Sequence, residues 1–426
     1  MTQVGKRLRE FRKRLKMTQG DLAEGICNRS YVSQIEKGQV IPSPEILEQL
    51  AKRLHTEIKE LWTETENPSF TLVEIQNSLR HIINRIDEQE WEIARKWLLK
   101  LQGAVIPQSE EGVYLWAKGK IAEVDGRLEQ AEDHYSNSIV LTQDSDNPTV
   151  LIRALDSLGH FYCEHDQPEK AVHLLNEALQ LLNRYEISGL LRISVLLHVG
   201  SMHSKLGEFY SAIEHLQQAK ELNKNYGILY KSGDLYLSLG NCYHQIQQYQ
   251  EAEAFYRQAL SIFEIANNPV RLAEVQLNLG LMYKETMVYE KAEACLKQAQ
   301  KFLSNQTEDE LLNFTRIALA DVYRLQKRLD EAKTLCQSVI SSDNEKMLAE
   351  AQFILAEVML MQGEDDEALI HLENARGYFT IKNMQAFLIK TYQLLGHIHL
   401  KISVLSKQLK CTSVLLLLQL KLNSFY

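Results

Sequence analysis

The side chains of this sequence that are best suited to a chemical task are the lysines and arginines near its N-terminus. The first 40 residues carry nine Lys or Arg against four Asp or Glu, whereas residues 67–426 carry 35 against 46. Clustered cations bind polyanions because each can neutralise a phosphate group. The net charge of the whole chain is −9, so we expect one small N-terminal region to meet nucleic acid. The alternative is a basic helix that is simply solvated.

Sequence motifs for catalysis or metal binding are missing. The chain contains no GxxxxGK[ST] phosphate loop, no GxSxG and no HExxH. No two of its six cysteines lie within four residues of each other, which excludes CxxC zinc or redox pairs. His160 and His165 are five residues apart and would not share a helical face well. We therefore expect no enzymatic activity, no cofactor and no bound metal.

Hydrophobic patterning also argues against a membrane protein. The longest purely apolar run, Val414 to Leu418, has five residues, whereas a bilayer span needs about 20. The N-terminus is charged from Lys6 onward, unlike a signal peptide. We expect a cytoplasmic protein with no membrane partner.

The basic region has the periodicity of short amphipathic helices. Apolar residues at Val4, Leu8, Phe11 and Leu15 predict a first helix. Thr18 with Asp21 forms a capping-box spacing before a second helix. The range 29–37 predicts a third helix, with Gly38 as its C-cap, and 43–44 (Ser-Pro) begins a fourth.

The strings TQGDLAEGICNRSYVSQIEKG and PSPEILEQLAKRL, within residues 4–62, closely resemble the helix-turn-helix of phage-repressor-like (XRE-type) regulators. In that family the second helix of the pair enters the major groove of double-stranded DNA. The resemblance implies base contacts, which arginine makes well to guanine and glutamine to adenine, at Arg29, Ser30, Ser33 and Gln34. It implies phosphate contacts at Arg12, Gln19, Asn28 and Lys37. The alternative is a helix-turn-helix used only for dimerisation.

Beyond a linker at 63–70, which lacks periodicity and contains Pro68, the chain repeats itself about every 40 residues. One alanine recurs in each repeat, at Ala131, Ala171, Ala212, Ala252, Ala292, Ala332 and Ala368. Twelve residues earlier stands a small residue, at Gly119, Gly159, Gly200, Gly240, Gly280, Ala320 and Ala356. Small residues at fixed offsets let two antiparallel helices approach closely, and such pairs stack into a solenoid.

These repeats resemble tetratricopeptide repeats, so we expect an all-α protein: a helix-turn-helix domain over 1–62, then a right-handed α-solenoid. Residues 71–402 hold eight repeats and the start of a ninth at Gly396. The stretch 403–426 has lost the pattern. It is either an atypical capping helix or a C-terminus altered from that of the family.

In such arrays the first helix of each pair lines the concave face. Three residues before each small residue lies an apolar row, Leu197, Leu237, Leu277, Ile317 and Phe353. An apolar row on that face indicates either a buried ligand or tight packing between neighbouring repeats. Amides near the row can hydrogen-bond a peptide backbone, and the cations Arg153, Lys284 and Arg324 can hold carboxylates. The candidate peptide contacts are Arg153, His160, Leu197, Ser201, Leu237, Asn241, His244, Gln245, Leu277, Asn278, Lys284, Ile317 and Arg324.

A repressor-like head followed by such repeats resembles the peptide-pheromone regulators of Gram-positive bacteria, the Rap/NprR/PlcR/PrgX type, and NprR-like members most of all. The resemblance implies a homo-oligomeric transcription factor that binds a DNA operator and a short re-imported signalling peptide, in quorum sensing or sporulation. Two alternatives remain. One is a Rap-like modulator that mainly binds a response-regulator protein, and the other is a scaffold that recruits proteins to DNA without a small ligand.

Overall fold

The computed structural model describes residues 3–38, 40, 42–56, 61, 70–145, 147–304, 306, 309–340 and 344–401. All regular secondary structure within these residues is helical, which confirms the expected all-α class. The chain divides into two compact units, residues 1–146 and 147–426. The tail at 403–426 and the linker, apart from Phe70, lie outside the described residues.

The N-terminal domain contains α1 (Gln3–Arg14), α2 (Gln19–Ala23), α3 (Arg29–Glu36) and α4 (Pro44–Arg53). Thr18 and Asp21 form the expected capping box at α2, and the Ser43 side chain caps α4. The C-cap of α3 is Lys37 rather than Gly38. Gly38 follows it with φ +72°, a left-handed conformation that glycine adopts without steric cost.

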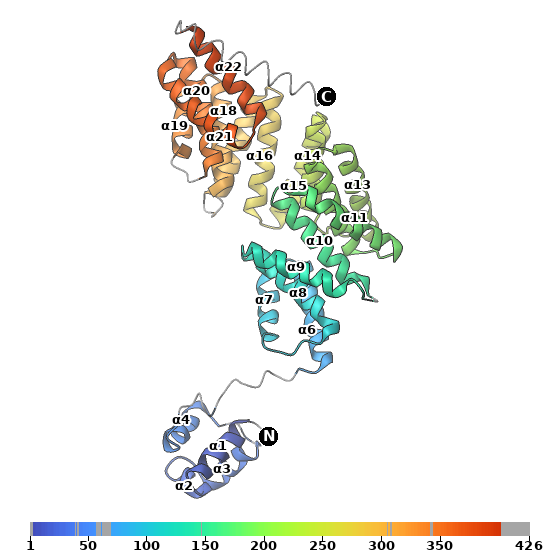
Figure 1. The fold of residues 1–426 in the computed structure, drawn as a ribbon, viewed down its shortest axis with the longest axis vertical. Coiled ribbons are helices and arrows are strands. Elements are labelled where there is room, and N and C mark those ends of the chain that lie inside the picture. The colour runs from blue at the N-terminus through green and yellow to red at the C-terminus, as the bar shows by residue number, and fades with distance from the viewer. Residues whose placement is uncertain are drawn as a thin grey trace. The chain divides into compact units, whose positions relative to one another are not determined.

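The repeats form eight helix pairs within the described residues, and each pair has a first and a second helix. The pairs are α6 (Leu72–Asp87) with α7 (Trp91–Lys100), α8 (Gln108–Val124) with α9 (Leu128–Thr142), α10 (Pro148–Glu164) with α11 (Pro168–Arg184), α12 (Leu190–Lys205) with α13 (Phe209–Tyr226), α14 (Ser232–Gln245) with α15 (Tyr249–Ile265), α16 (Pro269–Glu285) with α17 (Tyr289–Leu303), α18 (Asp309–Leu325) with α19 (Leu329–Ile340), and α20 (Glu345–Gln362) with α21 (Asp365–Ile381). A single helix, α22 (Gln385–Lys401), follows them. In the second unit the pairs from α10 to α21 stack one on the next (Figure 1).

The recurring small residues explain why the two helices of a pair pack so closely. A Cβ atom added to Gly159 on α10 would lie 2.6 Å from Cγ of Leu175 on α11. The recurring alanine of the second helix, Ala171 in this pair, is completely buried. The helix seam therefore has no space for a larger side chain at either position.

The turn inside each pair also has a constant geometry. One residue in each turn adopts a positive φ, and these residues are Gln89, Gly126, Asp166, Gly207, Gln247, Met287, Lys327 and Gly363. A left-handed residue ends the first helix and redirects the chain into the second. The prolines at 148, 168 and 269 each occupy the first turn of a helix, where the absent N–H removes no hydrogen bond.

Candidate functional site

Helix α3 presents a polar face while its other face anchors it in the N-terminal domain. Val32 and Ile35 are fully buried in a core shared with Leu8, Leu22 and Leu50. Asn28 caps the helix, because its Oδ1 accepts a hydrogen bond from the Tyr31 N–H at 2.7 Å. The four residues expected to read bases lie on α3: Arg29, Ser30 and Gln34 are exposed, and Ser33 is half-buried.

Arg12, one of the expected phosphate contacts, is buried and paired within the N-terminal domain. Its guanidinium makes a two-pronged ion pair with Glu36 at 2.6 and 2.9 Å and donates a third hydrogen bond to the Met17 carbonyl at 2.8 Å. Only 9% of Arg12 is exposed. We therefore reassign Arg12 from DNA contact to a structural role, because its donors already bind partners inside the domain.

Glu36 joins three helices of the domain. It accepts from Arg12 on α1 and, at 2.7 Å, from the side-chain amide of Gln19 on α2. Burial alone would raise the pKa of Glu36, but the hydrogen bonds from Arg12 and Gln19 lower it below the ordinary value. The carboxylate is thus charged and fixes α3 relative to α1 and α2. Of the expected phosphate contacts, Gln19 is half-buried in this cluster, whereas Asn28 and Lys37 remain exposed.

The apolar row of the first helices is buried between repeats, as the packing alternative predicted. Leu197, Leu237, Leu277, Ile317 and Phe353 are between 3% and 6% exposed. Leu237 and Leu277 belong to one continuous core that extends from α14 to α20. Four of these side chains were candidate peptide contacts, namely Leu197, Leu237, Leu277 and Ile317. Their burial removes them from the candidate surface.

Several polar candidates bind groups of the chain itself. Asn241 Oδ1 accepts a hydrogen bond from the Tyr256 hydroxyl at 2.8 Å, and His244 Nε2 lies 2.8 Å from Glu285. Lys284 and Arg324 both pair with Asp321, at 3.0 and 2.6 Å. The His244–Glu285 and Lys284–Asp321 contacts connect consecutive first helices, whereas Asn241–Tyr256 joins the two helices of one pair and Arg324–Asp321 lies within α18.

The charges on α16, α18 and α20 form a continuous ladder. Asp321 lies between Lys284 and Arg324, and Arg324 Nε also lies 3.3 Å from Glu357. Burial would raise the pKa of Asp321, but the two cations hold it below the ordinary value. Burial raises the pKa of Glu357. The ladder joins three repeats through half-buried side chains.

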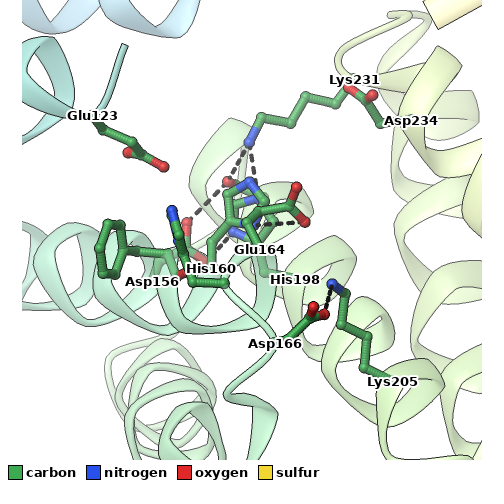
Figure 2. A network of polar contacts seen from close by, with 12 residues as sticks. Glu123, Asp156, His160, Glu164, Asp166, His198, Lys205, Lys231 and Asp234 are labelled. Carbon is green, nitrogen blue, oxygen red and sulfur yellow. Dashed lines mark hydrogen bonds and ion pairs between the residues drawn. The ribbon is translucent and has the colours of Figure 1, made fainter. Parts of the chain in front are cut away.

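A second polar cluster, which the sequence did not lead us to expect, lies among α10, α12 and the start of α14. Asp156 accepts hydrogen bonds from His198 Nδ1 at 2.7 Å and from Ser194 Oγ at 3.0 Å. Lys231 Nζ lies 3.0 Å from Ser194 Oγ and 3.2 Å from His198 Nε2. Figure 2 shows the Lys231 side chain reaching across to His198. A neutral imidazole with its proton on Nδ1 satisfies both of its contacts.

This cluster, which we call the Asp156 cluster (Asp156, Ser194, His198 and Lys231), is buried except for Lys231, which is half-buried. Asp156 and His198 are each 5% exposed, and the His198 ring stacks on His160 with centroids 4.1 Å apart. Burial would raise the pKa of Asp156, but the adjacent His198 and Lys231 hold it below the ordinary value. The sequence held one sign of this cluster. Asp156 stands three residues before the recurring small residue, where later repeats carry the apolar Leu197 and Leu237.

The remaining peptide candidates are Arg153, His160, Ser201, Gln245 and Asn278. Gln245 is exposed and the others are half-buried. Among the described residues, no group of three or more His, Cys, Asp or Glu side chains could hold a metal ion. None of the described helices has the length and apolar character needed to cross a bilayer.

Comparisons with known proteins agree with this division of the chain. Residues 8–61 match the helix-turn-helix family, and residues 191–265 match the tetratricopeptide repeat. No curated protein matches the sequence.

Solved structures of similar fold cover much more of the chain. The apo form of the quorum sensor NprR from B. thuringiensis has a TM-score of 0.69 and 16% identity, covering 82% of this chain and 99% of NprR. The apo form of RapI has a TM-score of 0.60 and 15% identity, with coverages of 82% and 98%. NprR in complex with its cognate peptide NprX has a TM-score of 0.52 and 14% identity, with coverages of 72% and 89%. The chain therefore joins a helix-turn-helix domain to tetratricopeptide repeats and shares its fold with NprR and RapI.

Proposed function

We propose that this chain is a cytoplasmic, homo-oligomeric transcriptional regulator that binds operator DNA and a short signalling peptide. The observation that carries the proposal is the exposed polar face of α3, with Arg29, Ser30 and Gln34 on a helix whose other face is anchored in the core. A helix held in this way can enter the major groove without rearranging, and its side chains meet the edges of the bases.

The anchoring of α3 supports sequence-specific rather than general DNA binding. The Arg12–Glu36 pair and the Asn28 cap fix the helix at both ends, so the backbone position from which Arg29 projects is set before DNA arrives. Preorganised contacts of this kind cost less conformational entropy on binding. Exposed Asn28 and Lys37 lie at opposite ends of α3, where they could contact phosphates on either side of the groove.

Selection of binding sites from a random duplex pool, followed by titration of the selected duplex, tests the DNA proposal. Arg29→Ala should lose about 1–3 kcal/mol at the selected site and relax one base position. Arg80→Ala, which changes an exposed arginine on α6 outside the N-terminal domain, should leave binding unchanged. Equal affinity and equal base preference in all three proteins would exclude α3 as the reading helix.

For the repeats, we propose that the peptide binds the polar side chains of the first helices rather than the buried apolar row. The side chains of Gln245 and Asn278 have no hydrogen bond to another described residue. Side-chain amides can both donate to and accept from a peptide backbone. Arg153, His160 and Ser201 extend this polar surface across α10 and α12. The similar fold of NprR, solved with the peptide NprX bound, supports the repeats as the ligand-binding part.

Mass spectrometry of material that co-purifies with the full chain tests whether a peptide is bound. A short peptide, recovered repeatedly and bound again as a synthetic copy in a fluorescence titration, would support the proposal. A chain that binds no recovered or synthetic peptide, while still binding its selected duplex, would indicate a DNA-binding scaffold.

A further inference from the structure

A cavity of about 260 Å³ that is open to solvent lies among α15, α16 and α17. Its lining includes Arg257 and Leu260 from α15, Gln276 and Tyr283 from α16, and Cys295 and Gln298 from α17. Leu279 and Ala294 complete its apolar wall. The cavity therefore lies between three helices of two consecutive repeats.

The same place one repeat earlier is filled by aromatic rings. Phe255 on α15 stacks on Tyr243 of α14, with ring centroids 5.4 Å apart, and lies 6.2 Å from the ring of Tyr236. Lys220 Nζ on α13 lies 5.3 Å from the centroid of Phe255. Centroid distances of about 4.5–7 Å are those of attractive aromatic pairs.

Residues at the filled place and at the open cavity correspond to each other with a shift of 40 in residue number. Tyr243 becomes Tyr283, so one ring is kept. Phe255 becomes Cys295, Tyr236 becomes Gln276, and Lys220 becomes Leu260. Two rings are thus replaced by smaller or non-aromatic side chains while the backbone framework repeats. The other described repeats carry a larger side chain at the position of Cys295, namely Trp97, His134, Leu174, His215, Leu335 and His371.

We propose that this cavity is a binding site for one aromatic ring that carries a polar atom, such as an indole or a phenol. Phe255 in the preceding repeat shows the shape of the missing group. Tyr283, whose ring centroid lies 5.0 Å from Lys291 Nζ, supplies an aromatic wall, and Leu260, Leu279 and Ala294 supply apolar contact. An enclosed apolar cavity of about 150 Å³ has room for benzene. The volume here is therefore large enough for one aromatic ring, part of which would remain exposed to solvent.

The polar residues at the cavity define where the heteroatom lies. Gln276 Nε2 donates to Gln298 Oε1 at 3.2 Å. The side-chain oxygen of Gln276 can then accept a hydrogen bond from an indole N–H. The side-chain N–H of Gln298 can donate one to a phenol oxygen. Burial raises the pKa of Cys295 to about 11, so at neutral pH the thiol is uncharged and behaves as a small apolar group. The site is independent of the proposed DNA and peptide contacts.

Titration calorimetry of the full chain with indole and with phenol tests the proposal. Cys295→Phe restores the ring that the preceding repeat carries and should weaken indole binding about tenfold or more, since the ring occupies the site. Cys295→Leu introduces the residue found at Leu174 and Leu335. It fills less of the cavity than phenylalanine does, so it should also weaken binding, but by a smaller factor. Leu335→Phe makes the same kind of change one repeat later, outside the cavity, and should leave the affinity unchanged.

N-acetyltryptophanamide distinguishes a free ring from one presented by a polypeptide. Binding of indole alone would identify a small aromatic molecule as the ligand, and binding of both would include a partner side chain. Either result supports the site when Cys295→Phe or Cys295→Leu weakens it. The proposal is overturned if indole and phenol do not bind the unaltered chain, or if both Cys295 variants bind them as tightly as the unaltered chain does.

Discussion

The N-terminal domain and the repeats of the second unit use their charged side chains in opposite ways. In the N-terminal domain one ion pair, Arg12 with Glu36, is buried beneath α3, and the polar residues above it, such as Arg29 and Gln34, face outward. In the repeats the charges of the first helices mostly bind one another, as Lys284, Asp321 and Arg324 do. The first arrangement leaves side chains available to a ligand, whereas the second joins neighbouring repeats.

Polarity on an inward-facing helix therefore does not by itself identify a binding surface. Buried charges need partners because their desolvation is costly. A charged residue between stacked repeats is therefore expected to find a partner within the chain. The residues that remain available after this pairing are the ones to test.

The largest expected effect comes from the apolar row of the repeats. Leu237→Asp places an unpaired carboxylate at a site that is 4% exposed, and we expect destabilisation of more than about 4 kcal/mol. Gln245→Asp adds the same charge to an exposed position on the same helix, where the change should stay within about 0.5 kcal/mol. Urea denaturation followed by circular dichroism measures both. A fully stable Leu237→Asp protein would mean that the row faces solvent or a ligand after all.

The Asp156 cluster should give the next largest effect. Asp156→Asn removes a buried charge from His198 and Lys231, and breaking such a pair costs on the order of 3 kcal/mol. Asp166→Asn is the matched control, because this carboxylate is 94% exposed and pairs with Lys205 only at 3.6 Å. Both carboxylates appear in Figure 2. Equal unfolding free energies for the two variants would show that the buried cluster does not hold the repeats together.

The pH dependence of stability tests the Asp156 cluster in a second way. The folded-state pKa of Asp156 lies below its ordinary value. Its contribution to the free energy of unfolding is therefore fully present above about pH 4, the pKa range of an unfolded aspartate. It is lost as the pH falls through the folded-state pKa. The unaltered chain should therefore lose stability on acidification more steeply than Asp156→Asn. Parallel curves for the two proteins would exclude this linkage.

The sequence predicted features that depend on residues close together in the chain, and it missed those that depend on residues far apart. The caps at Thr18 and Ser43 and the helix that carries Arg29 depend on residues three or four positions apart, and all were predicted correctly. The Arg12–Glu36 pair spans 24 residues, so only the folded domain reveals it. Likewise, periodicity identified the face that carries Leu237, but whether a neighbouring repeat buries that face depends on how closely the repeats stack.

The smallest single-residue effect is expected for Asn278 in peptide binding. Asn278→Ala removes a half-buried amide that no described residue satisfies, so we expect a loss of about 1–3 kcal/mol in peptide affinity. Its effect on folding should be small. Asn241→Ala is less informative, because it also removes the hydrogen bond from Tyr256. Gln218→Ala, at an exposed position on the second helix α13, should leave the affinity of the recovered peptide unchanged.

The most direct test of the central claim measures whether the two regions communicate. Operator affinity of the full chain should be titrated with and without the recovered peptide, and peptide affinity with and without operator. We expect a change of about 5–150-fold in operator affinity and, by thermodynamic linkage, the same factor in peptide affinity. Identical affinities in both pairs of titrations would contradict it, and would leave a protein whose repeats do not control its DNA-binding domain.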